Sequence, residues 1–181
     1  MIAMPKRLVV DASVVVKWFV PEIYADEARQ LLRQHNLLAP DLLFLEVLNV
    51  LWQQVKHNLL NQKEATSMIA TLLKAPLSIT PSANLTFSAF ELSIQYNQTM
   101  YDSTYVALAV REKAPLVTAD AKLYRALTAK GLARHVILLS DVNYLQLILQ
   151  QLQKDIGWNV YFANALKARF TLFLFFQQFA F

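Results

Sequence analysis

The stretch that decides the fold is residues 8–20, which read LVVDASVVVKWFV. Leu8–Val10 is a short apolar run rich in β-branched residues and Asp11 ends it, a pattern that predicts a buried strand. Val14–Phe19 then predicts a short helix. The first 19 residues, with a basic flank and an apolar run, resemble a secretory signal peptide. However, Asp11 and Lys17 interrupt the apolar run, and no small-residue cleavage site follows. The stretch is therefore interpreted as a first strand that enters a helix.

The rest of the chain repeats this alternation of short apolar runs and helical patterns. Further strands are expected at Asn36–Ala39, Leu77–Thr80, Ala114–Thr118 and Val136–Leu139. Helices are expected at Ala25–Gln34, Leu42–His57 with Asp41 as its N-cap, Gln62–Lys74, Ala83–Tyr96, Asp102–Lys113 and Ala121–Lys130. Strands separated by helices imply a parallel sheet with helices on both faces, so the predicted class is an α/β three-layer sandwich.

Composition narrows the classes of protein that this chain can belong to. With 56% hydrophobic and 17% charged residues, the chain is too apolar to be disordered over most of its 181 residues, which suit one domain. Because cysteine is absent, disulfides and thiolate zinc sites are excluded, which fits a reducing cytoplasm. A net charge of +4 suits a polyanionic partner, although no long Lys/Arg block is present and a simple basic surface explains the charge equally well.

The C-terminal stretch has a different composition from the rest. Residues 157–181 read GWNVYFANALKARFTLFLFFQQFAF and are rich in phenylalanine. The run is too short to span a bilayer, which needs about 20 apolar residues, so no membrane association is expected. A helix docked on the core, a surface for self-association or a partner, and a non-native tail remain open readings.

Four acidic residues fall near predicted strand ends or helix starts. Asp11 ends the first strand, and Asp120 follows the strand that ends at Thr118. Asp102 and Glu46 lie near the starts of their helices. In parallel α/β sheets, ligands bind outside the carboxyl ends of the strands. All four carboxylates can therefore lie at one edge of the sheet.

Each of these acids also has a structural explanation when taken alone. Asp102 and Asp120 suit the N-cap position of a helix, and Asp11 suits the same role for Val14–Phe19. Glu46 has helical spacing with Asn49 and Gln53, so these residues can form a solvated stripe. Taken together, the four acids would repel each other unless a cation lay among them.

Clustered carboxylates indicate a particular metal and a particular chemistry. In the absence of cysteine they select hard, oxygen-binding ions such as Mg²⁺ or Mn²⁺. The three histidines, His35, His57 and His135, are too scattered to predict a zinc triad. Such a metal suits phosphodiester cleavage, because it activates water and neutralises charge that develops on the phosphate. Two glycines cannot build a P-loop or a dinucleotide-binding turn, and no serine stands in a GxSxG context.

Four segments carry a family resemblance. They read VVDASVVVKWFVPE, APDLLFLEVLNVLW, YDSTYVALA and APLVTADAKL. In order and spacing they resemble the acidic blocks of PIN-domain nucleases, most closely the VapC-like toxins of bacterial toxin–antitoxin pairs. The resemblance covers Leu8 to Asp141, which predicts a PIN-like nuclease domain at residues 7–141. Residues 142–181, with a helix expected at Val142–Lys154, are left as a C-terminal extension.

The resemblance assigns roles to individual residues. It implies that Asp11, Glu46, Asp102 and Asp120 are catalytic and hold the metal. It also implies that Ser13, Asn49 and Thr118 support the site. The implied activity is that of a Mg²⁺- or Mn²⁺-dependent endoribonuclease, with direct water attack that leaves a 3′-hydroxyl and a 5′-phosphate. The alternatives are a non-catalytic PIN-fold binding module and a PIN nuclease that processes RNA.

The same resemblance implies partners and a location. The expected partners are an RNA substrate, a cognate antitoxin that covers the acidic site, and a second copy of the chain. The expected location is the cytoplasm. Apolar side chains of the early helices either form such partner surfaces or complete the core, the second being favoured: Trp18, Phe19, Leu31, Leu32, Leu59 and Leu60.

Overall fold

A computed structural model describes residues 6–142, and its strands form one parallel sheet. The strands are β1 (Arg7–Val10), β2 (Asn36–Pro40), β3 (Leu77–Thr80), β4 (Leu116–Thr118) and β5 (Val136–Leu138). Their order is β3-β2-β1-β4-β5, and each neighbouring pair is parallel. The predicted parallel α/β class is confirmed.

Helices connect each strand to the next. The α-helices are α1 (Ala12–Val15), α2 (Ala25–Gln34), α3 (Leu42–Lys56), α4 (Gln62–Leu72), α5 (Thr86–Tyr96), α6 (Met100–Glu112) and α7 (Ala121–Thr128). Short 3₁₀ segments are η1 (Val16–Trp18), η2 (Ser82–Leu85) and η3 (Ala133–His135).

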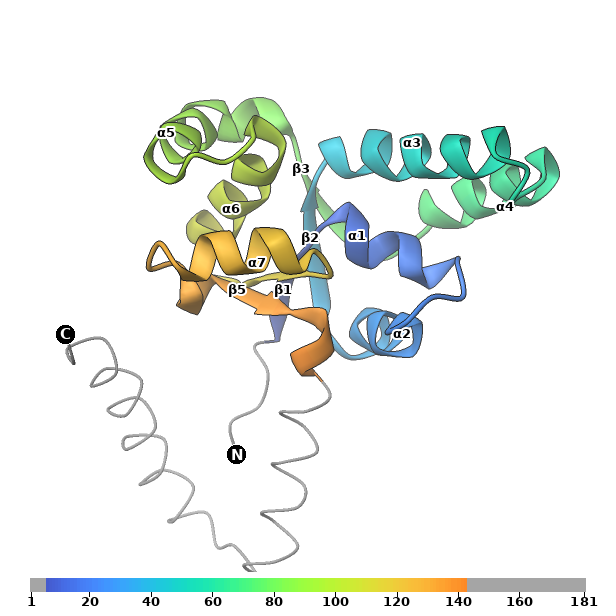
Figure 1. The fold of residues 1–181 in the computed structure, drawn as a ribbon, viewed down its shortest axis with the longest axis horizontal. Helices are drawn as coiled ribbons and strands as arrows, with labels where there is room; N and C mark the ends of the chain where they lie inside the picture. Colours follow the sequence, from blue (N-terminus) through green and yellow to red (C-terminus); the bar gives the residue numbers. More distant parts are fainter. Residues whose placement is uncertain (1–5, 143–181) are drawn as a thin grey trace, which may run out of the picture. The chain divides into compact units, whose positions relative to one another are not determined.

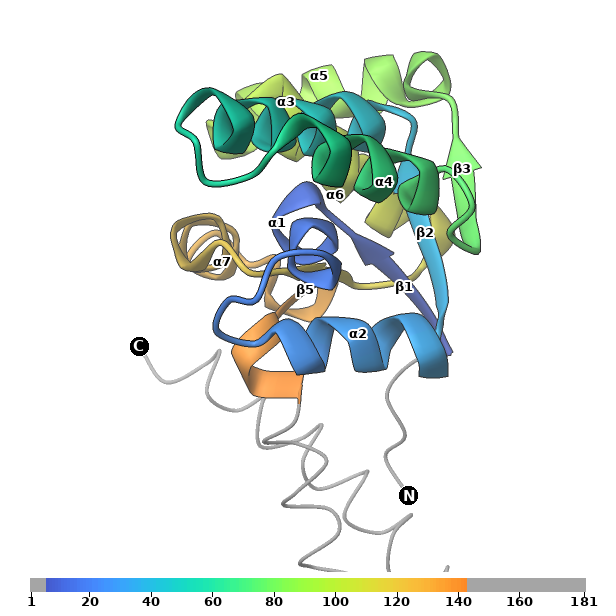
Figure 2. The same cartoon turned by 90° about the vertical axis from the view of Figure 1, so that its right-hand side faces the viewer.

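The helices lie in two layers with the sheet between them. Figure 1 shows α1–α4 on one side of the strands and α5–α7 on the other. Figure 2 looks onto the first side, where α1–α4 stand in front of the strands. The three middle strands are buried along most of their length, as expected for a parallel sheet covered on both faces, whereas β3 at the edge is partly exposed.

The strand order places a switch point between β1 and β4. The chain leaves β1 toward β2 and β3 on one side, then returns through α5 and α6 to β4 on the other side of β1. The connections that follow β1 and β4 therefore run over opposite faces of the sheet (Figure 1). In open parallel sheets, the space outside the carboxyl ends of two such strands is the usual ligand site. Asp11 directly follows β1, and Asp120 lies two residues after β4.

Several predicted boundaries need correction. The strand predicted at Ala114–Thr118 is β4, which starts at Leu116. Pro115 has no N–H to donate to a neighbouring strand, and only its carbonyl takes part, by accepting from the Val9 amide. The helix predicted at Ala83–Tyr96 is divided into η2 and α5. The helix predicted at Val14–Phe19 begins earlier and consists of α1 and η1.

Of two other predicted helix caps, Asp41 is confirmed in position and Asp102 is wrong. Asp41 stands at the N-cap position of α3 but makes no capping bond; its carboxylate instead accepts from the amide and hydroxyl of Ser82. These bonds hold the pKa of Asp41 below its usual value. Asp102 does not cap α6, because the helix begins at Met100 and Thr99 is its N-cap. Asp102 lies in the first turn instead.

The apolar residues of the early helices divide between core and surface. Trp18 and Leu31 are buried, and the Trp18 indole N–H donates to the Ala28 carbonyl at 3.0 Å. Leu59, after α3, has 72% of its surface exposed. The favoured core reading is therefore correct for the first two residues and wrong for Leu59.

The predicted extension at 142–181, with its helix at Val142–Lys154, lies outside the described residues except for Val142. The domain boundary near residue 141 stays a prediction. Between residues 6 and 142, no helix is both long enough and apolar enough to cross a membrane.

Candidate active site

The site begins at Asp11, at the carboxyl end of β1. Its side chain is only 7% exposed, and Oδ1 accepts hydrogen bonds from Ser13 Oγ at 2.6 Å and from the Val14 amide at 3.1 Å. Asp11 is thus also the N-cap of α1. Burial raises the pKa of Asp11 to about 6, with a smaller contribution from the charge of Glu46, and the hydrogen bonds only partly oppose this shift. A buried carboxylate with this pKa is costly to keep charged.

Ser13 links the ends of β1 and β4. Its hydroxyl donates to Asp11 and accepts from the Ala119 amide at 2.8 Å. Ser13 Oγ also lies 3.4 Å from Thr118 Oγ1, and that second hydroxyl accepts from the Asp120 amide at 3.0 Å. A chain of hydroxyls thus fixes the backbone at Asp120 relative to Asp11. Ser13 and Thr118 lie where the sequence predicted supporting residues.

Glu46 and Tyr105 meet from helices far apart in the sequence. The Tyr105 hydroxyl donates to Glu46 Oε2 at 2.5 Å, at the short end of the range for a hydroxyl and a carboxylate. Tyr105 on α6 is 2% exposed, whereas Glu46 on α3 is half-buried. Burial raises the pKa of Glu46, the charge of Asp102 adds to this, and the bond from Tyr105 acts against it. Glu46 is therefore not part of a fully solvated stripe, although Asn49 and Gln53 are exposed.

Asp102 and Asp120 each lie in or before the first turn of a helix. Asp102 Oδ2 accepts from the Thr99 hydroxyl at 2.7 Å, and the same Thr99 oxygen accepts from the Asp102 amide at 3.0 Å. Asp120 Oδ1 accepts from the amides of Lys122 at 2.7 Å and Leu123 at 3.1 Å, so the predicted capping of α7 is confirmed. Both carboxylates thus have a structural role in fixing the start of a helix.

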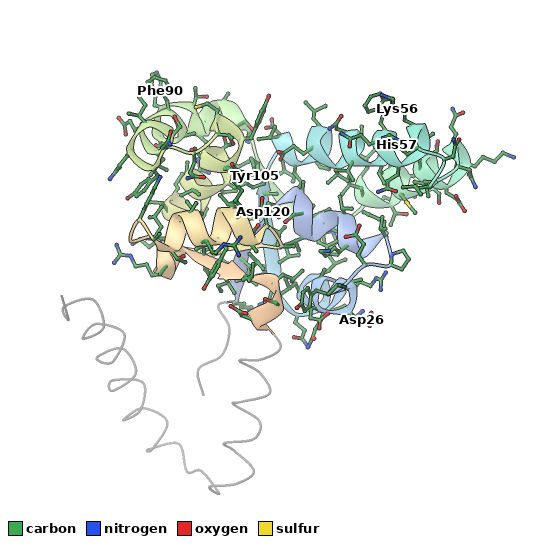
Figure 3. All side chains as sticks on the ribbon, in the orientation of Figure 1. Asp26, Lys56, His57, Phe90, Tyr105 and Asp120 are labelled. Carbon is green, nitrogen blue, oxygen red and sulfur yellow. The ribbon has the colours of Figure 1, made fainter. Side chains whose placement is uncertain are left out.

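Three of the four acids act electrostatically on the Tyr105 hydroxyl, and Glu46 also accepts its hydrogen bond. Burial raises the pKa of Tyr105 far above its usual range, and the charges of Glu46, Asp11 and Asp102 raise it further. Asp120 joins this group through Thr118 and Ser13, and its carboxylate faces the amides of its own helix. Figure 3 shows Tyr105 and Asp120 in the central region between the two groups of helices.

The donor set fits a hard divalent cation, since it consists of carboxylate and hydroxyl oxygens. Burial is the main cause of the raised pKa values of Asp11 and Glu46, and a cation bound beside these carboxylates would favour their charged forms. However, among residues 6–142 no three Asp, Glu, His or Cys side chains stand in an arrangement ready to hold a metal ion. The acids are thus electrostatic neighbours, and a closed coordination shell would require their side chains to move.

Asn49 and Tyr105 differ in what the sequence predicted of them. Asn49 is exposed on α3, three residues after Glu46, and its supporting role stays a prediction. Tyr105 was not predicted as a site residue. Its position three residues after Asp102 puts both on one side of α6, and this spacing is the signal that points to it in the sequence.

Comparison with known proteins identifies the family. The PIN domain family model matches residues 8–128. Ribonuclease VapC3 of Pyrobaculum aerophilum is 35% identical over 120 residues, which make up 65% of this chain and 92% of that relative. The chain therefore belongs to the PIN-domain family.

Solved structures share the fold. A crystal structure from Pyrobaculum aerophilum superposes with a TM-score of 0.55 at 21% identity, covering 77% of this chain and 94% of that one. A toxin–antitoxin complex from Klebsiella pneumoniae contains a chain that superposes with a TM-score of 0.51 at 17% identity, covering 73% of this chain and 97% of that one. These similarities confirm the three-layer PIN-like architecture.

Proposed function

We propose that the chain is a metal-dependent endoribonuclease that hydrolyses RNA phosphodiester bonds, and that it is the toxin of a toxin–antitoxin pair. The observation that carries the proposal is the burial of Asp11 at the end of β1, together with the electrostatic effect of Glu46 on Asp11 and of Asp102 on Glu46. Burial is the main cause of the raised pKa values of Asp11 and Glu46, and the neighbouring charges add to it. Structural carboxylates rarely need such an arrangement, whereas catalytic sites often do.

The comparisons support the class of reaction and of partner. The relative from Pyrobaculum aerophilum is named a ribonuclease of the VapC type, and the chain spans 92% of its length. The Klebsiella pneumoniae structure is a toxin–antitoxin complex whose chain has the same fold. On this basis we assign an RNA substrate and an antitoxin protein as partners. A homodimer and a cytoplasmic location are proposed only from the family resemblance.

Asp11, Glu46, Asp102 and Asp120 would hold the metal, with Mg²⁺ or Mn²⁺ as the ion. When bound, the ion lowers the pKa of a water molecule and neutralises charge that develops on the scissile phosphate. Water attack on phosphorus then breaks the bond to the 3′-oxygen and leaves a 3′-hydroxyl and a 5′-phosphate. The acids act as oxygen ligands and not as nucleophiles.

The residues around the acids keep them in place. Ser13 donates to one oxygen of Asp11 and accepts from the Ala119 amide, so the ends of β1 and β4 cannot separate without loss of the bond to Ala119. Thr99 orients Asp102 from the start of α6. These contacts fix the acids before substrate arrives, which avoids the entropy cost of ordering them during the reaction.

RNA cleavage by a neutralised variant tests the site. The double variant Asp11→Asn with Asp102→Asn should lose Mg²⁺- or Mn²⁺-dependent cleavage of a mixed RNA pool. Glu91→Gln, which neutralises an exposed acid on α5, should cleave as the wild type does. Full metal-dependent cleavage by the double variant would show that the site is misassigned.

Expression in a bacterial host tests the toxin role separately. Induction of the wild-type chain should arrest growth, and co-expression of a small neighbouring gene should relieve the arrest. RNA cleavage without growth arrest would favour RNA processing. Absence of both cleavage and divalent-ion binding would favour a non-catalytic binding module. Sedimentation of the purified chain tests the homodimer.

A further inference from the structure

Tyr105 on α6 is a buried polar side chain that contacts Glu46, an acid of another helix. It is 2% exposed, and its hydroxyl is bonded to Glu46, 59 residues away in the sequence. A buried tyrosine hydroxyl needs a partner, and a backbone carbonyl or a neutral side chain would satisfy it at lower cost than a carboxylate in a cluster of acids. The choice of Glu46 as the partner therefore points to a role in the site.

The bond has a defined direction. The tyrosine hydroxyl donates, because both oxygens of a carboxylate are acceptors and the tyrosine carries the O–H of the pair. It engages Oε2 of Glu46, which leaves Oε1 as the other oxygen of that carboxylate. Glu46 is only half-buried on α3, so without the bond its long side chain would be free to rotate into solvent.

Tyr105 lies on the same helix as Asp102, another of the four acids. Tyr105 and Asp102 lie three residues apart on α6, on the same side of the helix. The buried segment that follows Asp102 holds α6 firmly in the fold, since every residue from Ser103 to Ala109 is buried. A bond from Tyr105 to Glu46 therefore fixes the acid of α3 relative to the acid of α6.

Resting on the proposed function, we propose that Tyr105 is a positioning residue for Glu46, which it holds toward Asp11 and Asp102 so that the acids can share one divalent cation. Tyr105 does not touch substrate in this role. It acts through Glu46, in the way that hydrogen-bond partners of metal ligands orient those ligands.

The variant Tyr105→Phe tests this role, because it removes the hydroxyl and keeps the buried ring. In the absence of RNA, the Kd for Mn²⁺ measured by calorimetry should rise about tenfold. The kcat for RNA cleavage should fall by roughly 10–100-fold, while KM for RNA changes less than about threefold. Tyr101→Phe, which removes an exposed hydroxyl from the same helix, should match the wild type in all three quantities.

A double-variant cycle separates positioning from general loss of structure. Glu46→Gln removes the charge on which Tyr105 acts and keeps an acceptor for its hydroxyl. In that background, Tyr105→Phe should change the Kd for Mn²⁺ by less than about twofold. An undiminished tenfold effect in the Glu46→Gln background would overturn the proposal, because Tyr105 would then act independently of Glu46.

The two proposals fail in different ways. Mn²⁺ binding and RNA cleavage that are normal in Tyr105→Phe, with at most a lower Tm, would refute the positioning role and leave the nuclease assignment intact. A wild-type chain that neither binds Mn²⁺ nor cleaves RNA would refute the proposed function itself.

Discussion

The two halves of the candidate site are built in different ways. The strand half consists of Asp11, Ser13, Thr118 and Asp120, and hydrogen bonds between residues two or three positions apart hold most of it together. The helix half consists of Glu46, Thr99, Asp102 and Tyr105, and its main contact joins two helices. Within the strand half, each strand end is set by local bonds and Ser13 joins the two ends, whereas the Tyr105–Glu46 contact of the helix half forms only when α3 and α6 pack.

The two halves also differ in how deeply they bury a carboxylate. Asp11 is buried in the strand half, and its pKa of about 6 reflects a charge that the fold only partly compensates. In the helix half, Glu46 is half-buried and its pKa is raised by the same cause, burial. Because solvent reaches Glu46 more easily, neutralising the two acids should have unequal effects on stability.

Asp11→Asn should give the largest effect and should separate function from stability. RNA cleavage should fall by about 100-fold or more, since loss of a direct ligand should exceed the loss of a residue that only orients one. Asparagine retains the Oδ1 acceptor for Ser13 and Val14. The metal-free protein should therefore become more stable at pH 7.5 by roughly 2–3 kcal/mol.

The pH dependence of that gain follows from the raised pKa. The folded state keeps the proton of Asp11 up to a pH of about 6, whereas the unfolded chain loses it near 3.8, so the stability of the wild type falls as pH rises through this window. The advantage of Asp11→Asn should vanish at pH 4 and be complete above pH 7. Urea unfolding in EDTA at both pH values measures it, and an equal gain at both would contradict burial of the charge as the cause.

Ser13→Ala should disrupt the strand half with the second-largest effect. The change removes a donor to Asp11 and leaves the Ala119 amide without its acceptor, so unfolding free energy should fall by about 1–3 kcal/mol. Cleavage should fall as well, by roughly 10–100-fold. Ser88→Ala on the exposed side of α5 is the matched control, and urea unfolding should place it within about 0.5 kcal/mol of the wild type.

Thr99→Ala should weaken the helix half by about 1 kcal/mol, because it removes the N-cap of α6. It should also lower cleavage, since Asp102 loses the hydroxyl that orients its carboxylate. Asn61→Ala removes the N-cap of α4 and should cost a similar amount of stability. If the two variants lose cleavage equally, Thr99 acts through helix stability alone.

Glu46→Gln should change stability least. Neutralisation should stabilise the metal-free protein at pH 7.5, because the pKa of Glu46 is raised, but by less than about 1 kcal/mol owing to solvent access. Its RNA cleavage should nevertheless fall as sharply as that of Asp11→Asn. A stability gain as large as that of Asp11→Asn would mean that both halves of the site exclude water equally.

The sequence predicts the strand half better than the helix half for a physical reason. An acid directly after a buried apolar run, followed by Ser13, already specifies a strand end and a helix cap. The same holds for Thr118 and Asp120, because their bonds are local. The spacing of Asp102 and Tyr105 on α6 can be read from the sequence, but the bond from Tyr105 to Glu46 depends on the packing of α3 and α6. Thr99, and not Asp102, caps α6, because the helix begins at Met100, earlier than predicted.

Calorimetric titration of Mn²⁺ tests the central claim, that the clustered acids hold a divalent cation, most directly. At pH 6, Asp11 is about half protonated, so binding should release protons and the measured heat should depend on the ionisation heat of the buffer. The wild type should show saturable binding with proton release, and Asp11→Asn should bind more weakly and without that release. Equal binding by both proteins, or no binding by the wild type, would contradict the claim.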